Sequence, residues 1–332
     1  NYDICIVMGT GERIAYLADL NYISYYVGRD IDAPRFIKNS KEFWFKTPLH
    51  KLNFLERKFY HNTFKNAIAH IAGIWVYPFL EKYVNNGIKM DMQTIDNELF
   101  KNVKHEINIQ KTKFTFFSPQ RMGIPKGTDL LWKALKFCKT DFEILQVNWF
   151  DESNNEELKI KEQLLNELPS QIKLIPMIKR KKMPEYYSFS DAIIGNMRIG
   201  TWELVDLEGV KCGKPVLSYS DPNHKLLIKG NYIKSSFLPD SNKPKDIAKI
   251  IDKIVLSKEF RDKLFEDERR FVSNSTDKEW ISNWWDELFE TFFQKYGKIH
   301  KNSSSISIKI RMGLFLIGNR LYWKKIKKLI KI

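Results

Sequence analysis

The chain has 332 residues, 43% hydrophobic and 29% charged, which supplies enough apolar surface for two domains and excludes a disordered tail or a small disulfide scaffold. The net charge of +15 indicates an anionic partner: nucleic acid, a nucleotide phosphate or an anionic lipid. The three cysteines lack metal-site spacing, which disfavours a disulfide framework or a zinc site and fits a reducing cytoplasm.

The sequence has neither a membrane-spanning run nor a signal peptide, and it begins close to a predicted strand. No apolar run approaches the ~20 residues that span a bilayer, and no signal peptide opens the chain. The first residue is Asn1 rather than Met, and a strand-like apolar run has begun by Ile4. We therefore expect a fragment that lacks upstream elements.

Short apolar runs alternate with segments of helical period through most of the sequence. This alternation is typical of β-α units around parallel sheets, so we expect an α/β protein. In the first part, strands are predicted at 4–8, 22–27 and 66–72, and helices at 12–20, 52–64 and 75–83. The polar, weakly periodic segment 86–105 is the candidate domain boundary.

A second β-α series follows that boundary. Its predicted strands are 113–118, 142–147, 172–176, 192–194 and 215–218. Its predicted helices are 128–138, 156–168, 183–189 and 204–212. From Lys245 onward only helix signals occur, and a separate basic segment follows Ile299.

Two loops at strand-helix junctions are candidates for anion binding. Gly9-Thr10-Gly11 permits a tight turn, but the full dinucleotide fingerprint is absent, so a structural turn is the favoured interpretation. The loop 118–127 places Arg121 and Lys126 after a predicted strand, where both cations could reach a diphosphate in a ligand crevice. Taken alone, a solvated basic loop is favoured there.

A third stretch, residues 195–208, combines a strand end, a loop and a helix start. Such a helix start offers free N–H groups to a phosphate. Glu208, one turn inside, could accept hydrogen bonds from ribose hydroxyls, although by itself it reads as an ordinary surface carboxylate. Gly213 and Pro215 mark a helix end and a strand start, so taken locally they indicate secondary-structure boundaries and no functional role.

Together these segments resemble the retaining glycosyltransferases of the large group 1 class, family 4, in motif order and spacing. Arg121, Lys126 and Gly127 look like the arginine, lysine and glycine of that family's first donor-domain loop. The stretch 207–216 resembles its most characteristic segment. Further similar segments are 183–187 with 190–192, before the donor site, and 96–100, the interdomain linker.

The resemblance implies the GT-B fold, in which two Rossmann-like domains face each other across a cleft, here with a C-terminal helical tail. We expect a partial acceptor-side domain with its linker at 1–108. The nucleotide-sugar-binding domain and its closing helices are expected at 109–298. A basic amphipathic tail is expected at 299–332.

The resemblance also implies the site. Arg121 and Lys126 are the predicted catalytic residues, which would stabilise charge on the leaving diphosphate. The predicted donor-binding residues are Gly200, Thr201, Leu204, Val205 and Glu208, with Glu208 on the ribose. The predicted acceptor-side residues are Gly28 and Asp30, because Gly28-Arg29-Asp30 resembles an HGSD-like loop.

Two positions depart from the family pattern. Gly200 stands eight positions before Glu208, where the family usually has a glutamate that contacts the transferred sugar. Val27 stands at the histidine position of the HGSD-like loop. The sugar and the stereochemical outcome are therefore open.

Segment 299–332 contains nine Lys or Arg and no Asp or Glu. Its basic residues fall on one side of a helix and apolar residues on another, so it could lie on an anionic membrane surface. Packing on the protein body is an equal alternative. A nucleic-acid role is disfavoured, because no binding module accompanies the charge.

We expect a glycosyltransferase that moves a sugar from a nucleotide diphosphate donor to a saccharide or lipid-linked acceptor, with retention. It would need no metal and no cofactor besides the nucleotide sugar, and would act in the cytoplasm, peripheral to the inner membrane face. The alternative is a catalytically degenerate protein that binds nucleotide sugar or a partner. A third hypothesis is an electrostatic RNA binder, with strongly salt-dependent affinity.

Overall fold

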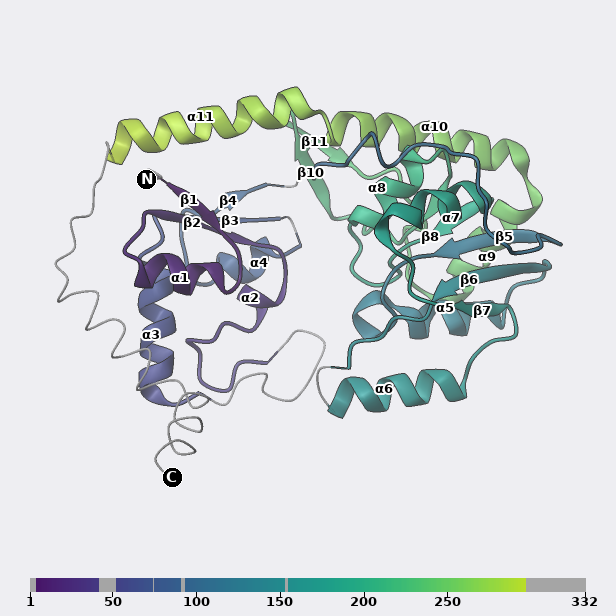
Figure 1. Ribbon diagram of the computed structural model, residues 1–332, viewed down its shortest axis with the longest axis horizontal. Helices are drawn as coiled ribbons and strands as arrows, with labels where there is room; N and C mark the ends of the chain where they lie inside the picture. The colour runs from purple at the N-terminus through teal and green to yellow at the C-terminus, as the bar shows by residue number, and fades with distance from the viewer. Residues whose placement is uncertain (1–3, 42–51, 74, 91–92, 153–154, 297–332) are drawn as a thin grey trace. The chain divides into compact units, whose positions relative to one another are not determined.

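The structure is a computed structural model that describes residues 4–41, 52–73, 75–90, 93–152 and 155–296 (Figure 1). Contacts among these residues divide them into two compact units. The first comprises residues 4–90 and 282–296, and the second comprises residues 93–281. The basic segment 299–332 lies outside the described residues, so its predicted amphipathic helix stays a prediction.

The first unit contains a four-stranded parallel sheet in the order β1-β2-β3-β4. Its strands are β1 (Cys5–Val7), β2 (Tyr22–Tyr26), β3 (Ala69–Ala72) and β4 (Ile88–Lys89). Its helices are α1 (Gly11–Leu17), α2 (Arg29–Asp32), α3 (Phe54–Lys65) and α4 (Tyr77–Leu80). The capping box between Asn53 and Glu56 fixes the start of α3. The helix predicted at 75–83 is one turn long, and the short β4 and α2 were not predicted.

The second unit contains a five-stranded parallel sheet in the order β7-β6-β5-β8-β9. Its strands are β5 (Phe114–Ser118), β6 (Phe142–Val147), β7 (Ile172–Ile175), β8 (Ala192–Ile194) and β9 (Val216–Leu217). Its sheet-covering helices are α5 (Thr128–Leu135), α6 (Asn155–Asn166), α7 (Met183–Phe189), α8 (Leu204–Lys211) and α9 (Pro244–Leu256), with short turns η1 (Ile124–Lys126) and η2 (Arg180–Lys182). The strand predictions here are correct to within two residues.

The core of the second unit explains why most residues of its strands are apolar. Phe116, Ile144 and Ile194 are fully buried, and α9 packs against α5 over the same apolar cluster. A parallel sheet covered on both faces buries both sides of each strand, so its strands lack polar alternation. The prediction of an α/β protein built on parallel sheets is confirmed.

A hairpin in the second unit was missed. Strands β10 (Lys225–Ile228) and β11 (Asn231–Lys234) pair antiparallel around Lys229 and Gly230, whose φ angles are 50° and 75°. Two consecutive positive φ angles define the turn of a tight two-residue hairpin. Lys-Gly is a weaker signal for that turn than Asn-Gly, which is why the sequence did not reveal it.

From Pro244 to the end of the described residues at 296, the regular elements are all helices, as predicted: α9 is succeeded by α10 (Lys258–Ser275) and α11 (Lys278–Tyr296). None of the helices in the described ranges is long and apolar enough to cross a bilayer.

Candidate functional site

The strand order of the second sheet places a topological switch point between β5 and β8. From β5 the chain winds outward to β6 and β7, then returns to β8 and continues to β9. In open α/β sheets, ligands bind beside such a point, at the carboxyl ends of the strands. Both loops that the sequence singled out, 118–127 and 195–203, start at this point.

The two loops are in direct contact. Met197 donates its backbone N–H to the carbonyl of Lys126 at 3.1 Å. Gly127 has a φ of 70°, and a Cβ there would lie 2.8 Å from the carbonyl carbon of Met197. Only glycine fits this left-handed, crowded position. Gly127 thus allows the approach of the two loops at the switch point.

Lys126 reaches the N-terminus of α8. Its ammonium group forms an ion pair with the carboxylate of Glu203, the N-cap residue of that helix. About a fifth of each side chain is exposed. Leu204 and Val205 form the first turn, where backbone N–H groups lack helical partners. Lysine and helix start together can hold an anion, and Glu203 supplies one from the chain itself.

Arg121 is paired elsewhere. Its Nη1 donates to Oδ2 of Asp151, in the loop after β6, at 2.7 Å. The guanidinium is 26% exposed and the carboxylate 13%. The structure therefore brings Lys126 to α8 but holds Arg121 against a neighbouring carboxylate.

Gly200 and Thr201 belong to the loop before α8. Gly200 has a φ of 80°, and a Cβ there would lie 2.7 Å from Cβ of Asp221. A glutamate at this position would require the chain around Asp221 to shift. The departure from the family pattern noted at Gly200 thus has a local steric counterpart. Thr201 is buried.

Glu208 is buried within the second unit, 1% exposed. Tyr187 donates its hydroxyl to Oε2 at 3.0 Å, and Nη2 of Arg180 lies 2.9 Å from Oε1. Burial raises the pKa of Glu208, and the charge of Arg180 offsets part of that rise. The interpretation of Glu208 as an ordinary surface carboxylate is wrong.

Asp206 is a buried carboxyl in the first turn of α8 that the sequence analysis did not single out. Its Oδ2 accepts the backbone N–H of Glu203 at 2.7 Å and the hydroxyl of Ser218 at 3.2 Å. Burial, followed by the charge of Glu203, raises its pKa to about 8. An acid three residues after the N-cap was the available sequence signal.

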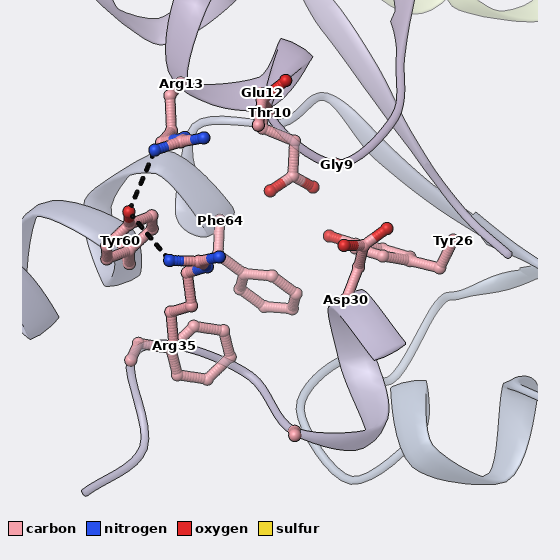
Figure 2. A pocket seen from close by; sticks show the side chains of 11 residues that line it. Gly9, Thr10, Glu12, Arg13, Tyr26, Asp30, Arg35, Tyr60 and Phe64 are labelled. Carbon is pink, nitrogen blue, oxygen red and sulfur yellow. Dashed lines mark hydrogen bonds between the residues drawn. The ribbon is translucent and has the colours of Figure 1, made fainter. Parts of the chain in front are cut away.

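In the first unit, Asp30 lines a pocket but Gly28 does not. Asp30 lies opposite Gly9, where a Cβ would be 3.7 Å from either carboxylate oxygen. Gly28 is the N-cap residue of α2. The other charged residues of this pocket, Glu12, Arg13 and Arg35, were missed because α1 and the segment after α2 carry no motif (Figure 2).

Within the described ranges, no group of three or more His, Cys, Asp or Glu side chains is placed to hold a metal ion.

The second unit is a doubly wound α/β domain with a cation and a helix N-terminus at its switch point. These features define a nucleotide-binding class of protein.

The comparisons identify the family. The profile of the Glycosyl transferases group 1 family matches residues 100–271, about half of the chain, and the chain belongs to this family. No curated protein matches it.

Solved structures identify the fold. Sucrose-phosphate synthase from Thermosynechococcus elongatus is 15% identical, with a TM-score of 0.63 over 89% of this chain and 74% of that one. Anabaena HepE in complex with UDP and glucose is also 15% identical, with a TM-score of 0.61 over 87% and 78%. The predicted membership of the group 1 glycosyltransferases, the GT-B fold and the glycosyltransferase activity are confirmed.

Proposed function

We propose that this glycosyltransferase uses a nucleoside diphosphate sugar and transfers the sugar with retention. UDP is the first nucleotide to test. The observation that carries the proposal is the position of Lys126 beside the N-terminus of α8 at the switch point. The UDP complex of HepE, which has a similar fold, supports the choice of base.

In this proposal the residues stabilise the leaving group. Lys126 and Arg121 neutralise charge that develops on the diphosphate, and the N–H groups of Leu204 and Val205 add hydrogen bonds. The loop of Gly200 and Thr201 adjoins the transferred sugar. No side chain forms a covalent intermediate; in retention, the leaving diphosphate assists the incoming hydroxyl.

The donor site requires two rearrangements in this proposal. A diphosphate at Lys126 displaces the carboxylate of Glu203, and the ribose shares Glu208 with Tyr187 and Arg180. Glu208 then accepts hydrogen bonds from the ribose hydroxyls. The first rearrangement replaces the Lys126–Glu203 contact by a contact to phosphate and releases the Glu203 carboxylate to solvent, and the second adds a charge-assisted hydrogen bond at Glu208.

Calorimetric titration with UDP, GDP and ADP tests the donor site. We expect UDP to bind and Lys126→Gln to weaken it about tenfold, since charge-assisted hydrogen bonds contribute roughly 1.5–3 kcal/mol. Lys133→Gln is the matched control, because Lys133 is an exposed lysine on α5. Equal weakening by both variants, or no nucleotide binding by the folded chain, would contradict the proposal.

A catalytically degenerate protein is the second candidate, and the Lys126–Glu203 pair favours it. A chain whose own carboxylate satisfies the lysine could bind nucleotides without turnover. Release of UDP from UDP-sugars, measured with acceptor panels, distinguishes the two. Nucleotide affinity without product in every panel supports the degenerate protein.

The acceptor and location complete the proposal. We place the enzyme in the cytoplasm, at the inner membrane face, with a lipid-linked or free saccharide as acceptor. The basic composition of 299–332 supports the membrane contact. Sedimentation with anionic vesicles, with and without residues 299–332, tests it.

A further inference from the structure

The pocket of the first unit contains a pair of arginines that meet at one hydroxyl group. Nη1 of Arg13 donates to the Tyr60 hydroxyl at 3.2 Å, and Nη1 of Arg35 lies 3.5 Å from the same oxygen. Their guanidinium carbons lie 5.8 Å and 5.3 Å from the Tyr60 ring centroid. Figure 2 shows both groups converging on Tyr60.

Within the part of the chain that the structure describes, these two cations form no close ion pair. Among the described residues, neither Arg13 nor Arg35 lies within salt-bridge distance of a carboxylate. Each guanidinium carries five N–H donors, of which the Tyr60 oxygen takes one. The remaining donors can receive a group with several acceptor oxygens, and two converging guanidiniums match a phosphate.

The opposite side of the pocket offers carboxyl groups. Oε1 of Glu12 is buried and has no hydrogen-bond partner among the described residues. Asp30 lies opposite Gly9. Burial raises the pKa of both carboxyls. For Glu12, the hydroxyl groups of Ser24 and Tyr26 and the charge of Arg13 offset part of the rise, whereas the charge of Asp30 adds to it. For Asp30, the charge of Arg35 offsets part of the rise. A carboxylate accepts hydrogen bonds from hydroxyl groups, and a protonated carboxyl can also donate one to them. Both forms can therefore bind the hydroxyl groups of a polyol.

The size and walls of the pocket fit the same kind of ligand. The cavity measures about 320 Å³, the lower end of small-molecule sites. The aromatic rings of Phe36, Tyr60 and Phe64 line it. They offer apolar faces for the C–H groups of a sugar ring. The pocket thus has a cationic end, a hydroxyl-binding end and aromatic walls.

We propose that this pocket binds a phosphorylated sugar or polyol, with the phosphate on Arg13 and Arg35 and the hydroxyls on Glu12 and Asp30. The inference rests on the proposed function, because it identifies the acceptor class as one that carries a phosphate. A free sugar phosphate and a lipid-linked phosphopolyol share this chemistry.

Calorimetric titration of the full chain tests the inference. The probes are the 1- and 6-phosphates of glucose, mannose, galactose and N-acetylglucosamine, together with inositol phosphate, the parent sugars and inorganic phosphate. We expect a phosphorylated probe to bind, and Arg35→Gln to weaken it about tenfold or more. Arg35 is exposed, so this variant should fold; Arg13→Gln is the second variant. Lys58→Gln, an exposed lysine on the same helix as Tyr60, is the matched control.

The inference would be overturned if no phosphorylated probe binds, if parent sugars bind as tightly as their phosphates, or if Lys58→Gln weakens binding as much as Arg35→Gln. Inorganic phosphate binding as tightly as the best probe would also overturn it. Vesicles of phosphatidylcholine, with or without phosphatidylinositol, then distinguish the two sources of the phosphate. Binding that depends on Arg35 and on phosphatidylinositol indicates a lipid-linked ligand, whereas Arg35-dependent binding of a free phosphosugar alone indicates a soluble one.

UDP titration on the same samples separates this inference from the proposed function. UDP binding that depends on Lys126, without phosphosugar binding, overturns the pocket assignment alone. Loss of UDP binding in a folded chain overturns the donor site instead.

Discussion

Lys126 and Glu203 form an ion pair between the loop after β5 and the N-cap of α8. The lysine and the helix start are the two features best suited to a diphosphate, and the chain's own carboxylate lies between them. A doubly charged donor must therefore compete with Glu203 for the same positive site.

Removal of that carboxylate charge should tighten nucleotide binding. We expect Glu203→Gln to raise UDP affinity about tenfold, because the diphosphate no longer displaces an anion from Lys126. Glutamine keeps the size of the side chain, and calorimetry measures the change. Glu162→Gln, an exposed acid on α6, should leave the affinity unchanged. Equal or weaker binding by Glu203→Gln would exclude competition by this carboxylate.

Gly127 and Gly230, two of the positive-φ glycines of the second unit, should respond differently to alanine. Both Gly127→Ala and Gly230→Ala place a side chain at positive φ, which costs about 1–2 kcal/mol. At Gly230 nothing lies within 4 Å of the added Cβ, whereas at Gly127 the backbone of Met197 lies 2.8 Å away. We expect Gly127→Ala to lower the free energy of unfolding by about 2 kcal/mol more, measured by urea denaturation, and to weaken UDP binding. Equal costs would show that the loop contact is not constrained.

The sheet elements of the second unit could be predicted because their signal is local. Phe142 to Val147, for example, is a mostly apolar segment in which every residue except Glu143 is buried, and polar residues flank it. The hairpin around Lys229 and Gly230 could not be predicted, since its turn has no Asn-Gly signal. Strand β4 consists of Ile88 and Lys89 only and is defined by its pairing with β3. Such pairing is a property of the folded chain.

For the site, sequence identified the loops but not the contacts. Lys126 was singled out by its place after a strand, yet its partner Glu203 is 77 residues away in the chain. Glu208 was recognised through its motif, but its burial depends on Tyr187 and Arg180 from other elements. Long-range ion pairs and hydrogen bonds leave no periodic signal in one sequence. The partners of Lys126 and Glu208 could therefore be identified only from the folded structure.

Discrimination between ribose and deoxyribose tests the role of Glu208. We expect the wild-type chain to prefer UDP over 2′-deoxy-UDP, because the carboxylate accepts a hydrogen bond from the 2′-hydroxyl. Glu208→Gln should reduce that preference about tenfold, the value of one charge-assisted hydrogen bond. Tyr187→Phe removes a contact to the same carboxylate and should keep the preference. Unchanged discrimination in Glu208→Gln would assign this residue to structure alone.

The buried carboxyl of Asp206 should make stability depend on pH. Its pKa is raised from 3.8 to about 8 in the folded chain, so between these values the folded state holds a proton that the unfolded state has lost. Its contribution to stability is therefore full below 3.8 and is lost as pH rises through about 8.

Asp206→Asn provides the measurement, because an amide mimics the protonated acid at all pH values. We expect the free energy of unfolding of the wild-type chain to fall relative to this variant by at most about 1.4 kcal/mol per pH unit as pH rises within that range. Urea denaturation of the second unit's transition at several pH values checks the slope. Ser218→Ala removes one contact that favours the ionised form and should extend the decline to higher pH. A difference between Asp206→Asn and wild type that is constant with pH would mean that Asp206 is ionised in the fold. The electrostatics of the first turn of α8 would then be set by two negative charges, Asp206 and Glu203, and donor binding would have to overcome both.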